Sequence, residues 1–272
     1  MAGPERTTFN SSDLSLAYRL EAAESANIIA LASALGHGYP EAAFQPFAGG
    51  TAVFAGVDSP MTHALGIGLG GPVPEPEMEA MENFFRNRGS ACLIDLCPMA
   101  DPSVVAFVQS RPYRVVEFNN VLARRIDRGE MFQRSPGIRP AAGADLSTWA
   151  RVVAEGFSEN IPLNDEAVKH MAATFAAGQC WLAGTAESDP IGGAGMGIQN
   201  GVALFWGDSI LLSARRKGWQ SALIAERLEA ARQQACDLAM VSVLPGGGSH
   251  RNYERADFQL IYMRVNLKRD FA

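Results

Sequence analysis

The chain has 272 residues, of which 47% are hydrophobic and 19% are charged, so it can bury a substantial core as one large domain or two modest ones. This composition excludes a disordered, collagen-like or coiled-coil protein. The net charge of −6 provides no overall attraction for nucleic acid or an anionic membrane, so we expect neither as a partner.

The four cysteines are too few for a disulfide framework, and they form no CxxC pair and no zinc-like cluster with histidine. We therefore expect a reducing, cytoplasmic location and no metal site. The first residues are polar, and no stretch approaches the roughly 18 apolar residues that a membrane span needs. The sequence accordingly predicts neither an export signal nor a membrane helix.

The first half of the chain predicts a helix and two strands. Residues 77–86 begin with acidic side chains, which stabilise a helix N-terminus, and residues 93–96 and 113–124 are strand-like. The glycines at 66–71 are similar to a dinucleotide-binding loop. That run opens onto prolines and acids, however, which indicates a strand end instead.

The boundary between the halves lies in residues 127–140, where charges, glycines and prolines interrupt the apolar pattern. We place an N-terminal domain at residues 1–130 and a C-terminal domain at residues 137–272.

The second half predicts an alternation of helices and strands. Asn200-Gly201 suits a two-residue hairpin turn, because both positions then need positive φ values. The predicted elements are helices at 145–157 and 164–177, strands at 180–185, 191–198 and 202–212, a helix at 219–235, a strand at 238–244, a short helix at 251–256 and a strand at 258–267.

The two halves end alike. Residues 113–124 align with residues 258–269 at an offset of 145, and the strand at 93–96 aligns with the one at 238–244 at a similar offset. The order of the elements agrees in both places. The sequence therefore predicts two copies of one α/β unit.

The most informative chemistry lies just before the helix at 219–235. Arg215, Arg216 and Lys217 stand where the helix macrodipole already presents positive charge, which disfavours each cation by roughly a few tenths of a kcal/mol. An anionic ligand would remove that repulsion. Free N–H groups of a first helical turn, with Gly218 allowing close approach, form a phosphate cradle. The alternative is a solvated basic turn.

Two motifs in this order resemble the GNAT superfamily of acetyl-CoA-dependent N-acetyltransferases. One is Arg-x-x-Gly-x at the start of a helix, and the other is Tyr-Glu-Arg-x-x-Phe at 253–258, before the last strand. The resemblance covers about residues 137–269. It implies a fold of two tandem α/β (α+β) domains, each a mixed, mostly antiparallel twisted sheet flanked by helices.

The resemblance also implies which residues bind the cofactor, acetyl-CoA. The loop amides that hold the pyrophosphate would belong to Arg215, Arg216, Lys217, Gly218, Trp219, Gln220 and Ser221. The strand that pairs with the pantetheine arm would include Ile210, Leu211 and Leu212, with a backbone N–H near Leu211 as the oxyanion donor. Two residues depart from the family pattern: Gln220 stands in place of Gly or Ala, and Asp257 in place of Gly. Asp adopts positive φ more readily than most residues, so the second departure is tolerable.

Amide formation needs a base for the amine and an acid for the departing thiolate. The resemblance places Tyr253 as the general acid, and its phenol stays protonated at neutral pH. The alternative is an aromatic side chain packed in the core or under the cofactor. Asp208 or His250 is the candidate base, and water could also carry the proton.

The N-terminal copy has lost this chemistry. At the offset of 145, residues 215–220 fall on residues 70–75, where prolines lack N–H groups and glutamates would repel pyrophosphate. We therefore expect a tandem protein whose C-terminal copy transfers acetyl to the primary amine of a small molecule or peptide, by direct attack on the thioester, as a monomer or homodimer. The alternatives are a non-catalytic acyl-CoA-binding or regulatory module and a transferase of a longer acyl group.

Overall fold

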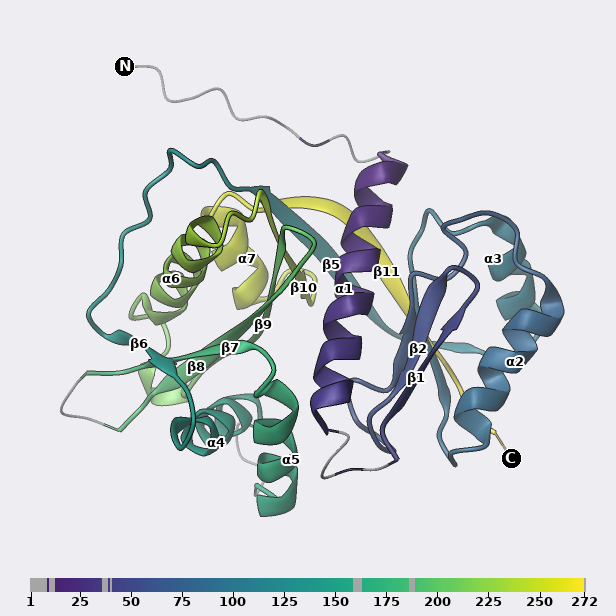
Figure 1. Cartoon of the computed structure of the whole chain (residues 1–272), viewed down its shortest axis with the longest axis horizontal. Coiled ribbons are helices and arrows are strands. Elements are labelled where there is room, and N and C mark those ends of the chain that lie inside the picture. The colour runs from purple at the N-terminus through teal and green to yellow at the C-terminus, as the bar shows by residue number, and fades with distance from the viewer. Residues whose placement is uncertain are drawn as a thin grey trace.

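The computed structural model describes residues 9, 13–35, 39, 41–158, 163–185 and 189–271. These residues form three layers, with one mixed sheet of 11 strands in the middle and helices on both faces (Figure 1). No helix in the described part of the chain is long and apolar enough to cross a membrane.

The first half contributes α1 (Leu14–Leu35), β1 (Ala43–Phe47), β2 (Gly50–Phe54), β3 (His63–Leu65), α2 (Glu75–Arg86), β4 (Cys92–Leu96), α3 (Pro102–Gln109) and β5 (Arg114–Arg125). The second half contributes β6 (Ile138–Ala141), α4 (Asp145–Ser158), α5 (Asp165–Phe175), β7 (Gln179–Ala183), β8 (Gly192–Gln199), β9 (Val202–Ile210), a 3₁₀ turn (Leu212–Ala214), α6 (Trp219–Gln233), β10 (Leu238–Val243), α7 (Gly248–Arg255) and β11 (Gln259–Arg269).

The two halves exchange their last strands. The strand order is β1-β2-β3-β4-β11-β5-β10-β9-β8-β7-β6, so β11 lies between β4 and β5, and β5 lies beside β10. Figure 1 shows β5 and β11 crossing side by side between the halves. The two units therefore share a single continuous sheet, and the division at residues 130 and 137 stays a prediction.

Several local predictions are confirmed. The strands β5 and β11 begin at Arg114 and Gln259, which are 145 residues apart (259 − 114). Asn200 and Gly201 have φ values of 50° and 77°, as a hairpin turn of this type requires. Asp257 has a φ of 65°, the left-handed conformation that its place before Phe258 predicts.

The helix α1 is absent from the predicted elements. Asp13 caps it, because its Oδ1 accepts the N–H groups of Ser15 at 3.0 Å and Leu16 at 3.2 Å. Its buried residues pack against both halves: Leu20 clusters with Leu204 of β9, and Leu31 clusters with Val53 of β2. This helix therefore ties the two halves together on one face of the sheet.

The alternation of side chains along the strands shows which face of the sheet each of the other helices covers. In β7, Cys180 and Leu182 pack against α4, whereas Trp181 and Ala183 pack into the cluster of α6. In the same way, Val53 of β2 faces α1, and its neighbours on that strand face α2. Helices α1, α4 and α5 therefore cover one face of the sheet, and α2, α3, α6 and α7 cover the other.

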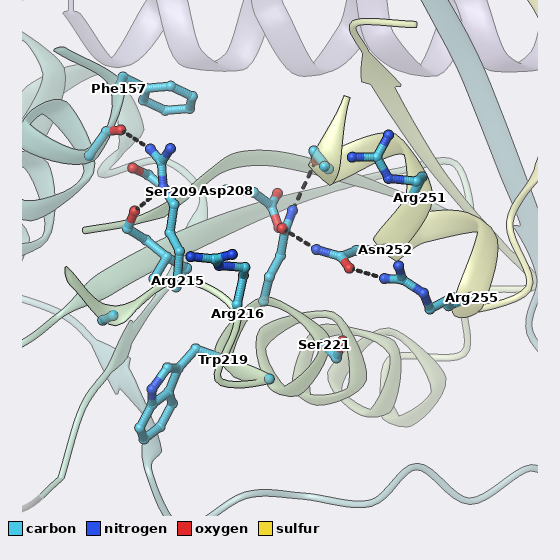
Figure 2. A pocket seen from close by; sticks show the side chains of 17 residues that line it. Phe157, Asp208, Ser209, Arg215, Arg216, Trp219, Ser221, Arg251, Asn252 and Arg255 are labelled. Atoms are coloured by element: carbon cyan, nitrogen blue, oxygen red, sulfur yellow. Dashed lines mark hydrogen bonds between the residues drawn. The ribbon is translucent and has the colours of Figure 1, made fainter. Parts of the chain in front are cut away.

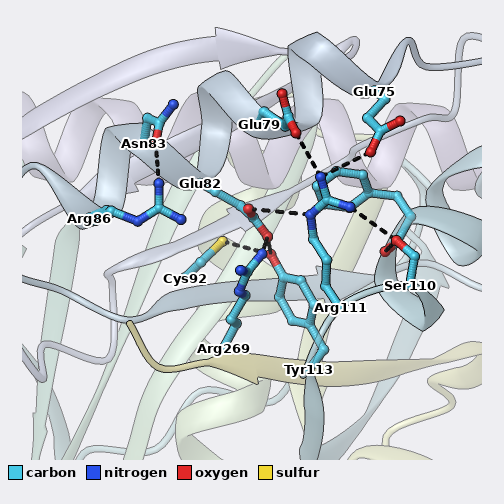
Figure 3. Close-up of polar contacts among 11 residues, drawn as sticks. Glu75, Glu79, Glu82, Asn83, Arg86, Cys92, Ser110, Arg111, Tyr113 and Arg269 are labelled. Carbon is cyan, nitrogen blue, oxygen red and sulfur yellow. Dashed lines mark hydrogen bonds and ion pairs between the residues drawn. The ribbon is translucent and has the colours of Figure 1, made fainter. Parts of the chain in front are cut away.

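The exchanged strand β11 is held in the first half by buried ion pairs. Arg269 pairs with Glu82 of α2, whose carboxylate also accepts the hydroxyl of Tyr113 at 2.9 Å (Figure 3). Arg111 bonds to Glu75 at 3.0 Å and lies 3.6 Å from Glu82. Glu75, at the start of α2, is thus part of a structural network.

Candidate active site

The strands β9 and β10 are parallel neighbours that separate partway along the sheet. Their pairing runs from Val202–Leu238 to Phe205–Val241 and stops there, although β9 continues to Ile210. Beyond Phe205, the edge of β9 that faces β10 has no strand partner. Such an edge offers N–H and C=O groups to which an extended ligand can bond.

A bulge in β9 follows the point of separation. The register with β8 passes from Gly195–Trp206 to Gly193–Ser209, so β9 contains an extra residue there. Gly207 has a φ of 69°, which explains a glycine at this position. A bulge bends a strand and redirects its side chains, and here it precedes Asp208, which meets residues of α6 and α7.

Asp208 forms a buried network with Arg227 of α6 and Tyr253 of α7. The guanidinium of Arg227 pairs with both carboxylate oxygens, one of them at 2.9 Å. The hydroxyl of Tyr253 donates to Oδ2 at 2.8 Å. Burial raises the pKa of Tyr253 well above its usual value, so the phenol stays protonated at neutral pH.

This network bears on the two catalytic residues predicted from sequence. Asp208 lines the cavity described below, but Arg227 and Tyr253 already occupy its oxygens. Tyr253 has 0% exposure and is not among the residues that line the cavity. Their roles as base and acid stay predictions, and a proton on Tyr253 would have to reach the cavity by way of Asp208 or a small movement of α7.

A cavity of about 660 Å³ opens where β9, α6 and α7 meet (Figure 2). Seven of the ten predicted cofactor residues line it: Ile210, Arg215, Arg216, Gly218, Trp219, Gln220 and Ser221. Leu211, Leu212 and Lys217 are not among the lining residues. Seven of the predicted residues therefore line one cavity, and their role in binding a cofactor stays a prediction.

The loop before α6 has two residues in the left-handed region of backbone conformation. Gly218 has a φ of 85°, and a Cβ added there would meet no atom within 4 Å. The preceding Arg216 also has a positive φ, of 62°. No side chain caps the N-terminus of α6, and the residues of its first turn line the cavity, so N–H groups without a helical partner lie beside it.

Guanidinium groups surround this helix end. Arg216, Arg251 and Arg255 line the cavity, and Figure 2 shows Arg216 reaching into it. Arg215 has a different place, because its Nε donates to the carbonyl of Ile210 at 3.0 Å and its Nη2 to that of Gly156 at 2.9 Å. Arg215 therefore fixes the end of β9 against α4.

The strand predicted to pair with the pantetheine arm extends beyond the observed C-terminal end of β9. The strand ends at Ile210, and Leu212 begins a 3₁₀ turn with 64% of its surface exposed. The chain turns here because the N–H of Ala214 bonds to the carbonyl of Leu211 at 2.8 Å. The N–H of Leu211 itself donates to the carbonyl of Ile191 at 2.9 Å, and the oxyanion donor expected near Leu211 stays a prediction.

The side chain of Gln220 crosses from α6 to α7. Its Nε2 donates to Oγ of Ser249 at 2.9 Å, and its Oε1 accepts a hydrogen bond from Asn252. It lines the cavity, so it helps to join the two helices that shape it. His250, the other candidate base, accepts the N–H of Gly246 at 2.9 Å and has a structural contact within its own turn.

The matching place in the first half is filled by the chain itself. The strands β3 and β4 pair at Ala64–Ile94 and Leu65–Asp95, and the next N–H, of Gly66, donates to the Glu21 carboxylate at 3.1 Å. Arg264 of β11 holds that carboxylate from the other side at 2.7 Å. Prolines 74 and 76 stand at the start of α2. The first half therefore has a carboxylate on its strand edge, and its helix has a proline without an N–H group in the first turn.

No protein-family model matches the chain, and no curated protein is similar to it in sequence. Solved structures are similar in fold. A GCN5-related N-acetyltransferase from Kribbella flavida has a TM-score of 0.67 over 94% of this chain and 96% of that chain, at 17% identity. A tandem GNAT protein from the clavulanic acid biosynthesis pathway matches 98% of both chains, with a TM-score of 0.58 and 11% identity.

The chain has the tandem GNAT fold. A further match, a GCN5-related N-acetyltransferase from Sphaerobacter thermophilus, covers 76% of this chain and 71% of that chain with a TM-score of 0.56 and 17% identity. These identities establish the fold, and the chemistry of this GNAT-like site rests on the residues of the chain itself.

Several residues of the site were not among those predicted from the sequence. Arg251, Asn252 and Arg255 lie within or beside the motif at 253–258 and line the cavity. Arg227 lies between Ile224 and Leu228 on the helix. A charged residue within this apolar stripe is the feature of the sequence that could have identified it. A lone Arg in such a stripe indicates a buried partner.

Proposed function

We propose that the second half of the chain binds acetyl-CoA and transfers its acetyl group to a primary amine. One observation carries the proposal. The same cavity is bordered by an uncapped helix N-terminus, by three guanidinium groups and by an unpaired strand edge. Few ligands need an anion cradle and a strand partner together. Coenzyme A needs both, because it joins a pyrophosphate to a flexible amide chain.

The phosphates would be held by the first turn of α6. Its N–H groups and the positive end of the helix macrodipole favour an anion. Gly218 leaves space above the backbone, and Arg216 supplies a charge that can approach the pyrophosphate. Arg251 and Arg255 stand on α7, where they can meet a further phosphate.

The pantetheine arm would pair with β9 beyond Phe205. An amide chain that lies along this edge satisfies backbone groups that β10 leaves free. The arm would bring the thioester toward the bulge at Gly207 and Asp208. Backbone N–H groups of the same edge are the candidate donors to the oxyanion.

The reaction forms a C–N bond and breaks a C–S bond. The neutral amine attacks the thioester carbonyl, its surplus proton passes to water or to Asp208, and the thiolate of coenzyme A leaves with a proton. Tyr253 is the proposed source of that last proton, delivered through a small movement of α7, and the proton that Asp208 takes from the amine then restores the phenol. Arg227 would hold Asp208 in place throughout.

A second candidate is a non-catalytic module that binds acyl-CoA. The observation that favours it is the closed network of Asp208, Arg227 and Tyr253, in which the two predicted catalytic groups bond to each other. Thiol release from acetyl-CoA across a panel of amines distinguishes the two functions. The four cysteines of the chain are buried, so they contribute little to a thiol assay.

We further propose a cytoplasmic protein that works as a monomer or homodimer on a small-molecule or peptide amine, without a nucleic-acid or membrane partner. The first half would shape the acceptor site, because α1 lies against β9 beside the cofactor cavity.

A further inference from the structure

A second cavity, of about 550 Å³, adjoins the cofactor cavity. The two share four lining residues, Phe157, Asp208, Gly248 and Ser249. The cofactor cavity lies on the side of α6 and α7, whereas the second one is lined by α1, β9 and β10. Since Asp208 lines both cavities, a molecule in the second cavity would meet the thioester of the proposed cofactor there.

The walls of the second cavity are mainly apolar and aromatic. Phe175 and Trp206 are stacked, with ring centroids 4.5 Å apart, and Phe157 lines the same space. From α1, Ile28 and Leu31 face it, four and seven residues after Glu24, so the three lie on one face of the helix. Such walls favour a flat, apolar body.

The polar side chains of the cavity are the acids Asp208 and Glu24, the amides Asn27 and Asn119, and the hydroxyls of Ser242 and Ser249. Asp208 belongs to β9, and Glu24 is held by Arg264 of β11, with β10 and β5 between these strands. Asn119 of β5 also lines the cavity. Among the described residues that line it, none is lysine, arginine or histidine. A carboxylate or phosphate would therefore be buried near acids without a cationic partner, which is unfavourable.

We propose that the acceptor, in the acyl transfer proposed above, is a primary amine on an aromatic body, with a hydrogen-bond donor at its far end and no anionic group. The amine lies at Asp208, where its nitrogen attacks the thioester carbonyl. The ring packs between α1 and the Phe175–Trp206 pair. The far donor bonds to Glu24 and Asn119. Glu24 thus acts in specificity and has no part in the proton transfers.

Two matched pairs of amines test the class: tyramine against tyrosine, and tryptamine against tryptophan. Each pair differs by one carboxylate. We expect kcat/KM for the amine to exceed that for the amino acid by about 100-fold or more, because the carboxylate finds no cation in the cavity. Equal rates for both members, or transfer confined to peptide N-termini and polar aminoglycosides, would overturn the proposal.

Glu24→Gln tests the far end of the cavity. We expect KM for tyramine to rise about tenfold, KM for acetyl-CoA to stay unchanged, and the preference for tyramine over phenethylamine, which lacks the far hydroxyl, to shrink. A purely structural role would not change the ratio between two acceptors. Glu166→Gln is the control, since Glu166 is exposed on α5 outside both cavities. An unchanged ratio in Glu24→Gln would contradict the assignment, and the wild-type panel decides the class by itself if the variant does not fold.

Calorimetry separates this proposal from the proposed function. Tyramine is titrated into free protein and into protein with excess coenzyme A, and acetyl-CoA is titrated into free protein. Acetyl-CoA binding without tyramine binding overturns the acceptor class and leaves the cofactor site standing. Tyramine binding without acetyl-CoA binding supports the acceptor cavity and removes the acyl transfer.

Discussion

The hydroxyl of Tyr253 donates a hydrogen bond of 2.8 Å to Oδ2 of Asp208, and both side chains are largely withdrawn from solvent. This contact joins the short helix α7 to the bulged end of β9. It places the predicted acid and the predicted base within one hydrogen bond of each other, beside the cofactor cavity. The chemistry and the stability of the site are therefore coupled.

Tyr253→Phe tests the acid role. We expect acetyl-CoA affinity to stay within twofold, turnover to fall by about 100-fold, and the free energy of unfolding to fall by about 1 kcal/mol, because one hydrogen bond to a buried carboxylate is lost. Tyr262→Phe is the matched control, since its buried hydroxyl donates to Glu21 at 2.7 Å outside the cavity. Equal turnover in the wild type and in Tyr253→Phe would remove Tyr253 from the mechanism.

Asp208→Asn leaves the buried guanidinium of Arg227 without its counter-charge. We expect the free energy of unfolding in urea to fall by about 3 kcal/mol, the usual cost of breaking a buried ion pair. Asp145→Asn is the control, since its pair with Arg139 is exposed and should be worth at most about 1 kcal/mol. Equal losses in both variants would mean that Asp208 and Arg227 do not form a buried pair.

Gly218→Glu tests the anion cradle. The new side chain brings a negative charge to the N-terminus of α6, where a Cβ meets no atom within 4 Å, so we expect the Kd for acetyl-CoA to rise at least about 100-fold. Gly89→Glu is the matched control: its φ is 66° and its surroundings are equally open, so it has the same backbone strain far from the cavity. A similar loss of affinity in both variants would count against the cradle.

The ion pair of Glu229 with Arg232 leads us to expect a pH dependence of stability in acid. The guanidinium of Arg232 lowers the pKa of Glu229 from 4.5 to about 2 in the folded chain. Because the folded state holds the charged form, this contact stabilises the protein above pH 4.5, and its contribution is lost as the pH falls to about 2. In Glu229→Gln, the free energy of unfolding should vary less over that interval. Glu166→Gln should follow the wild-type curve, and a wild-type slope in Glu229→Gln would contradict the pKa assignment.

Most residues that line the first cavity could be brought together from the sequence because they are adjacent in the chain. The cations at 215–217, Gly218 and the start of α6 form one uninterrupted segment, and macrodipole electrostatics alone marks it as unusual. The left-handed Asp257 and the hairpin at Asn200-Gly201 are local in the same sense. Each depends on the conformational preferences of one or two residues.

The features that could not be predicted are the long-range ones. The strands β5 and β11 have similar sequences, so either could close either half, and the choice depends on contacts such as Arg269–Glu82 that span the chain. The helix α1 packs on several sides, which weakens the amphipathic periodicity by which helices are recognised. Its Glu24 and Ile28 reach the second cavity only through that packing.

The most direct test of the proposed function is the calorimetric titration of the whole chain with acetyl-CoA. We expect saturable binding of one molecule per chain, because the cavity between β9 and α6 is open, whereas the Glu21 carboxylate occupies the matching place in the first half. The absence of binding would contradict the central claim. Binding of two molecules per chain would contradict the assignment of the first half.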